Sequence, residues 1–115
     1  MTILRSKATQ KKYDAYIVGG VGEGCVLCQK EPINSFTHWK IVSNDFPYDR
    51  IAKTHHMIVP IRHSDESELT DDEVQELRTL KETYIADHYD DIIEATRHQK
   101  SIPHHFHLHI IVEDT

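Results

Sequence analysis

The chain is poor in cysteine, glycine and proline: its 115 residues include two cysteines, four glycines and four prolines. It has no apolar run near the roughly 20 residues that a helix needs to span a bilayer, and no internal repeat or low-complexity linker. Residues 1–16 lack the apolar core of a signal peptide. We therefore expect an intracellular protein of the cytoplasm, with no membrane partner.

The length favours one domain, since 115 residues can bury a core but leave no room for two large domains. Hydrophobic residues make up 38% and charged residues 28%, as in a soluble globular protein. Residues 1–15 are polar and predict a flexible or loosely helical lead-in. Residues 16–115 would form the domain itself.

The net charge of −6 is unfavourable for binding a long nucleic acid. Twelve of the nineteen acidic residues lie between Asp65 and Glu94, which predicts a solvated helix face. A small phosphorylated ligand remains possible, because local donors decide its binding more than net charge does.

Strands and one helix can be assigned from local patterns. Aromatic and β-branched residues predict strands over 36–42, 55–59 and 105–111. A capping box at Thr70–Glu73 starts a helix with apolar residues at three- and four-residue steps. That helix ends near His88 or near Thr96, and residues 90–95 suit either a helix end or a short strand. The expected fold class is α+β.

Histidine alternates with apolar residues near the C-terminus, at His105, His107 and His109. In a strand the three imidazoles would share one face. They could then bind a metal together. Alternatively, a neutral imidazole could attack phosphorus while its neighbours hold the phosphate oxygens. A surface strand with incidental histidines is a third possibility.

The two cysteines, Cys25 and Cys28, form a Cys-x-x-Cys pair. In a reducing compartment this spacing leaves a metal site, a redox pair or two thiols without a special role.

Three segments resemble motifs of the histidine triad (HIT) superfamily of nucleotide hydrolases and transferases. Residues 105–111 (HFHLHII) resemble the triad signature, and residues 55–63 (HHMIVPIRH) resemble the family's second strand. The Cys-x-x-Cys pair is similar to one near the start of many members. The resemblance implies a HIT-like fold, an antiparallel sheet with one main helix packed on it, and a homodimer.

The resemblance also implies roles for histidines. His107 would attack the α-phosphorus and form a covalent nucleotidyl-histidine, His109 would donate to the phosphate, and His55 would complete the site. A backbone carbonyl near the second motif would hold the other nitrogen of His107. Expected substrates are purine nucleotides: nucleoside phosphoramidates, adenylylated compounds or dinucleoside polyphosphates.

Further residues match substrate-binding positions of the family. Asn44 resembles a ribose-binding residue, although it also suits a turn. Gln99 and Ser101 resemble phosphate contacts, and Lys100 is a possible substitute. Ile41 and Phe46 are candidate walls of a base pocket or core residues.

In zinc-bearing members the cysteines are completed by two histidines, here His63 and His105. The resemblance thus implies a structural Zn²⁺ site of Cys25, Cys28, His63 and His105. Two alternatives remain open: a metal-binding protein or metalloenzyme using the strand histidines, and a nucleotide sensor without turnover.

Overall fold

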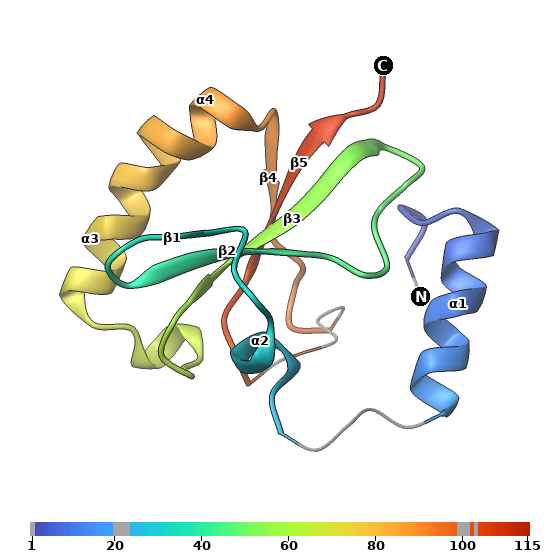
Figure 1. The fold of residues 1–115 in the computed structure, drawn as a ribbon, viewed down its shortest axis with the longest axis horizontal. Coiled ribbons are helices and arrows are strands. Elements are labelled where there is room, and N and C mark those ends of the chain that lie inside the picture. The colour runs from blue at the N-terminus through green and yellow to red at the C-terminus, as the bar shows by residue number, and fades with distance from the viewer. Residues whose placement is uncertain (1, 20–23, 99–101, 103) are drawn as a thin grey trace.

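A five-stranded antiparallel sheet forms the centre of the computed structural model (Figure 1), which describes residues 2–19, 24–98, 102 and 104–115. The strands are β1 (Asn34–Ser35), β2 (Trp39–Ser43), β3 (Ala52–Pro60), β4 (Asp91–Ile93) and β5 (Leu108–Glu113), in the order β1-β2-β3-β5-β4. Both β4 and β5 follow the main helix in the chain, and β4 lies at the sheet edge beside β5. The ambiguous segment 90–95 therefore contains a short strand, and the helix does not reach it.

One long helical segment packs on the sheet: α3 (Asp71–Leu80), the π-helical turn η2 (Lys81–Ile85) and α4 (Ala86–His88). It begins as expected, because Thr70 and Glu73 form both hydrogen bonds of a capping box. It ends at His88, the earlier of the two predicted ends. The prediction of an α+β fold with one main helix is confirmed.

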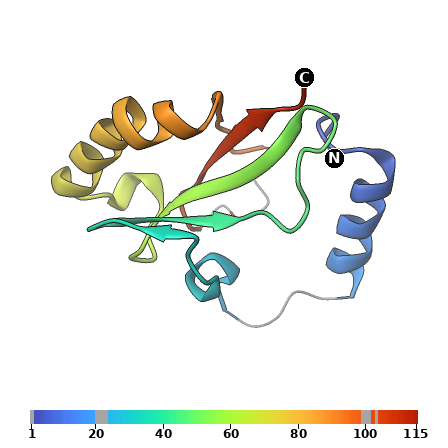
Figure 2. The same cartoon turned by 45° about the horizontal axis from the view of Figure 1, so that its top comes forward.

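Alternate residues of the strands pack into two hydrophobic clusters, one on each face of the sheet. Ile41, Ile58 and Ile110 pack with Leu77 and Leu80 beneath the long helix. The side chains that alternate with these along β2 and β3 point to the other face of the sheet. There Val42, Met57 and Val59 pack with Leu27. Figure 2 shows α2 (Val26–Gln29) on the side of the sheet away from α3 and α4. The even-odd alternation of β3 and β5 thus sends His55 and His109 to the face away from the long helix.

The last strand is shorter than predicted, because it starts at Leu108 and not at His105. Pairing with β3 ends at Ile58–Leu108. Before that point the Phe106 N–H donates to the Ser64 carbonyl at 2.8 Å, so the chain leaves the ladder. His105 and His107 therefore precede the strand, and of the triad only His109 lies in it.

The predicted lead-in contains an ordered helix, α1 (Lys7–Val18), which runs past residue 15. The Asp49 carboxylate accepts from the Ser6 N–H at 2.6 Å, the Ser6 hydroxyl at 2.8 Å and the Thr9 hydroxyl at 2.5 Å. These bonds hold the pKa of Asp49 down at about 2, mainly through the Ser6 N–H. The first turn of α1 is thereby fixed to the loop between β2 and β3. The division at residue 15 stays a prediction.

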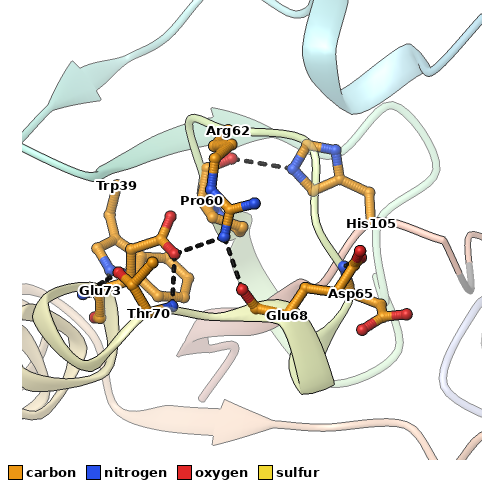
Figure 3. A network of polar contacts seen from close by, with 8 residues as sticks. All are labelled: Trp39, Pro60, Arg62, Asp65, Glu68, Thr70, Glu73 and His105. Carbon is orange, nitrogen blue, oxygen red and sulfur yellow. Dashed lines mark hydrogen bonds and ion pairs between the residues drawn. The ribbon is translucent and has the colours of Figure 1, made fainter.

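A polar network joins the end of β3 to the start of α3 (Figure 3). Arg62 donates to Glu73 at 2.8 Å and to the Glu68 carbonyl at 2.7 Å. The Trp39 indole donates to the Glu73 carbonyl at 2.8 Å. The network fixes the backbone on both sides of His63. In the described part of the chain no helix is long and apolar enough to cross a membrane.

Candidate active site and metal-binding cluster

Two cysteines and two histidines meet where α2 lies against the segment before β5. Cys25 Sγ is 3.2 Å from His105 Nδ1, Cys28 Sγ is 3.4 Å from the same nitrogen, and Cys28 Sγ is 3.2 Å from His63 Nδ1. All four donor atoms lie within 4.8 Å of one another. A Cys₂His₂ cluster that could bind a metal ion is therefore present.

The donor set matches the chemistry of a closed tetrahedral site. With Zn–S near 2.3 Å and Zn–N near 2.0 Å, a tetrahedron places sulfur and nitrogen about 3.5 Å apart. The three measured separations are close to that value. His105 Nε2 lies 2.9 Å from the Pro60 carbonyl (Figure 3), which fixes its proton on Nε2 and leaves the Nδ1 lone pair toward the sulfurs.

The thiols would have to lose protons to ligate a metal. Burial, followed by the hydrogen bond and charge of the neighbouring Cys25, raises the pKa of Cys28 above its ordinary value. Without a metal, Cys28 is therefore a protonated thiol at neutral pH. Metal binding would release that proton.

His107 is oriented by the backbone of His105. Its Nδ1 lies 3.0 Å from the His105 carbonyl, which can only accept, so Nδ1 carries the proton of the neutral ring and Nε2 carries the lone pair. The expectation of a carbonyl near the second motif was wrong for this residue. The carbonyl there, that of Pro60, contacts His105 instead. Because the chain leaves the ladder before Leu108, the His105 carbonyl is turned back toward His107.

Two further histidines form a chain with fixed proton positions. The Tyr48 backbone N–H donates to His55 Nδ1 at 2.9 Å, so the proton of neutral His55 is on Nε2. His55 Nε2 lies 2.8 Å from His109 Nδ1 and donates to it. The proton of His109 must then be on Nε2, where the Tyr48 hydroxyl oxygen lies 3.4 Å away. A backbone amide thus determines which nitrogen of His109 is the donor.

Both histidines of this chain are neutral over the physiological range. Burial is the main cause that lowers the pKa of His55 to about 3, with smaller effects from the charges of Arg5 and His56. Burial also lowers the pKa of His109 to about 3, followed by the effects of His55 and His107. Neutral rings are required for the alternating donor and acceptor pattern.

His107 and His109 lie at a cavity of about 100 Å³ on the sheet face away from the long helix. The cavity also contacts three other parts of the chain: the N-terminal segment with α1, the cysteine-containing helix α2 with Lys30, and the loop after β2. Its remaining lining residues are Arg5, Tyr13, Tyr16, Ile17, Val26, Leu27, Lys30, Asn44, Asp45, Phe46, Met57 and Ile102.

The expected substrate-binding residues fall into three groups. Asn44 and Phe46 line the cavity, and the Asn44 side chain also accepts from the Phe46 N–H at 2.8 Å, as in a turn. Ile41 is fully buried in the core beneath the long helix and is not a cavity wall. The predictions for Gln99, Lys100 and Ser101 lie outside the described residues.

Sequence reasoning missed the contribution of the N-terminus and of Tyr48. The Tyr13 and Tyr16 rings pack on Phe46, with centroids 5.3 and 5.1 Å away. Tyr13, Tyr16 and Ile17 follow a three- and four-residue step, so an apolar helical stripe was present within a polar segment. No local pattern indicates the backbone donor role of Tyr48.

Several solved structures have a fold similar to that of this chain. A histidine triad protein from Clostridium difficile superposes with a TM-score of 0.56 at 15% identity, covering 83% of this chain and 94% of that one. A HIT family hydrolase from Legionella pneumophila Philadelphia 1 gives 0.55 at 18% identity, covering 76% and 91%. The chain has the histidine-triad fold. A HIT family hydrolase from Clostridium thermocellum gives 0.54 at 17% identity, covering 83% and 94%.

These solved structures share the overall fold of this chain. Comparison of the sequence with protein-family models gave no match, and comparison with curated proteins gave none either. The resemblance carried by the three motifs is thus confirmed at the level of the fold.

Proposed function

We propose that this protein is a nucleotide hydrolase or transferase that forms a covalent nucleotidyl-histidine on His107. The observation that supports this most is the arrangement of protons in the site. His107 holds its proton on the nitrogen bonded to the His105 carbonyl, which places the lone pair on Nε2. His109 has the opposite pattern, with an acceptor at Nδ1 and a donor at Nε2. A nucleophile and an N–H donor therefore share one cavity.

The proposed reaction has two displacements at phosphorus. The His107 Nε2 lone pair attacks the α-phosphorus, and the bond to the leaving oxygen or nitrogen breaks with its electron pair. A leaving nitrogen takes up a proton from solvent and departs as the neutral amine. A phosphate oxygen accepts from His109 Nε2–H, which stabilises the charge that develops there. Water then attacks the same phosphorus and releases a proton to solvent, and the P–N bond breaks with its electron pair returning to His107 Nε2. The products are the neutral imidazole and a nucleoside monophosphate.

The substrate class follows the resemblance: a purine nucleoside phosphoramidate, an adenylylated compound or a dinucleoside polyphosphate. Asn44 would contact the ribose, with Gln99, Ser101 and Lys100 as proposed phosphate contacts. His55 would hold His109 in its donor form. The cytoplasmic location and the homodimer stay predictions.

We further propose that Zn²⁺ occupies the cluster of Cys25, Cys28, His63 and His105 as a structural ion. A closed set of four protein ligands leaves no position for a substrate. Bound there, the metal would link α2 and the end of β3 to the segment before β5. The chemistry at phosphorus would then belong to His107 alone.

A metalloenzyme in which the three triad histidines share one metal is disfavoured. His105 Nδ1 faces the cysteine sulfurs, while His107 Nδ1 faces a carbonyl and His109 Nδ1 faces His55. The three rings therefore present their nitrogens to different partners. A nucleotide sensor without turnover is distinguished by the following experiment.

The test measures release of the nucleoside monophosphate from adenosine 5′-phosphoramidate by the wild type and by the variants His107→Ala and His107→Asn. We expect turnover by the wild type, none above background by either variant, and nucleotide binding within about threefold of the wild type. Undiminished turnover in the variants would refute His107 as the nucleophile. Binding without turnover in the wild type would favour the sensor.

A further inference from the structure

Arg5 places a positive charge at the cavity wall. It lies outside the three sequence motifs that resemble the histidine triad superfamily. Its guanidinium carbon lies 4.5 Å from the centroid of the Tyr13 ring and 5.2 Å from that of the Tyr48 ring. Its Nε donates to the Phe46 carbonyl at 2.7 Å. Two aromatic faces and one backbone carbonyl thus hold the guanidinium at the cavity wall.

Among the described residues, no carboxylate pairs with Arg5. Among the described residues, the carboxylate that lines the cavity is that of Asp45, and it pairs with Lys30 at 2.9 Å. Asp49, the other acidic residue of this loop, is engaged by Ser6 and Thr9. No ion pair of Arg5 occurs in the described part of the chain. Arg5 is therefore a cation beside the cavity without a counter-ion among the described residues.

The remaining donors of Arg5 suit an anion with two oxygens. A guanidinium has five N–H donors, of which Nε–H is the one with an acceptor among the described residues. Both Nη groups are left to donate, and a guanidinium stacked on rings keeps its in-plane donors accessible. Phosphate and carboxylate accept such a pair of hydrogen bonds in parallel.

The anion bound by Arg5 would be separate from the phosphate that reacts. Tyr48 contacts His109 directly, with ring centroids 4.9 Å apart and its hydroxyl 3.4 Å from Nε2. Arg5 contacts the Tyr48 ring and makes no hydrogen bond to His109 among the described contacts. Arg5 and His109 therefore share a contact with the Tyr48 ring, and no hydrogen bond joins them among the described residues.

We propose that Arg5 binds a second anionic group of the substrate, next to the phosphate attacked by His107. This rests on the proposed function and deepens it, because it favours substrates whose leaving group is itself a phosphate over phosphoramidates of neutral amines. The class selected is a nucleotide with at least two phosphate groups, such as a dinucleoside polyphosphate.

Binding measurements test the proposal without any need for turnover. Adenosine 5′-monophosphate and adenosine 5′-diphosphate differ by one phosphate, and calorimetric titration gives the Kd of each. We expect the wild type to bind the diphosphate about tenfold more tightly or better, as hydrogen bonds to a charged group allow. Arg5→Gln should abolish this preference and leave the monophosphate affinity within about threefold. Arg5→Lys should retain part of it, since the charge remains and the paired donors are lost.

Arg50→Gln is the matched control. Arg50 also holds the N-terminal segment, donating to the Ile3 carbonyl at 2.9 Å, but it does not line the cavity. The control should keep the full preference for the diphosphate, and thermal unfolding of each variant reports whether α1 stays folded. Equal wild-type affinity for the two nucleotides, no binding of either, or an equal loss for both in Arg5→Gln would overturn the proposal. None of these results bears on the covalent step at His107, which is measured separately.

Discussion

Acid should destabilise this protein well before its carboxylates are protonated, because His55 and His109 are buried in their neutral forms. Their side chains are 5% and 6% exposed, and both have a pKa of about 3 in the folded chain. In the unfolded chain a histidine has a pKa near 6.5. Between these values the unfolded state binds more protons, so the free energy of unfolding must fall as the pH is lowered.

The size of the effect follows from the two pKa values. Within this window the free energy of unfolding falls by up to about 1.4 kcal/mol per pH unit for each histidine. The stabilisation from each neutral ring is fully retained above pH 6.5 and is lost progressively toward pH 3. From pH 6 to pH 4 each would cost about 2.5 kcal/mol, or about 5 kcal/mol together. Domains are typically stable by about 5–15 kcal/mol, so this loss is a large share of the total.

Urea-induced unfolding at pH 6, 5 and 4 measures the effect, with a chelator present so that metal release does not contribute. His55→Gln should reduce the loss between pH 6 and pH 4 by about 2.5 kcal/mol. His98→Gln, which removes an exposed imidazole, should leave it unchanged. An equally steep pH dependence in His55→Gln and the wild type would refute the reasoning that these rings are held neutral.

Two other predictions concern stability. At zinc concentrations about 1,000 times Kd, mass action adds about 4 kcal/mol, or roughly 16 °C in Tm for a chain of this length. A Cys25→Ser/Cys28→Ser variant should show no zinc-dependent shift in scanning fluorimetry, and a shift as large as that of the wild type would contradict the assigned ligands. Asp49→Asn should cost about 1 kcal/mol at pH 7, a figure reduced for the partial exposure of the carboxylate. Because the folded pKa is lowered, this contribution should disappear between about pH 4 and pH 2, and a difference that persists at pH 2 would argue against it.

The features that could be predicted from sequence depend on short segments. Thr70 and Glu73 are three residues apart, and their capping box forms within one turn. The cysteines are close in the chain, and motif resemblance supplied the two histidines that lie beside them in the fold. In both cases the chemistry of the side chains restricts the arrangement strongly, so a pattern of a few residues suffices.

The features that could not be predicted depend on contacts between distant segments or on the backbone. Helix α1 lines the cavity because Asp49 binds its first turn and Phe46 packs on Tyr13 and Tyr16, some 30 residues away in sequence. The carbonyl that orients His107 comes from the point where the chain leaves the sheet. Backbone geometry of this kind leaves no residue-type signal, and the role of the Tyr48 N–H is another example.

The most direct test of the covalent step is the intact mass of the protein after brief incubation with adenosine 5′-phosphoramidate and quenching in denaturant at alkaline pH. We expect an increase equal to one adenylyl group, located by peptide mapping on His107 and absent from His107→Asn. The quench is kept alkaline, since a phosphorus–nitrogen bond to imidazole hydrolyses at low pH. An adenylyl group on another residue, or rapid turnover with no adduct at any time, would contradict the proposed covalent nucleotidyl-histidine.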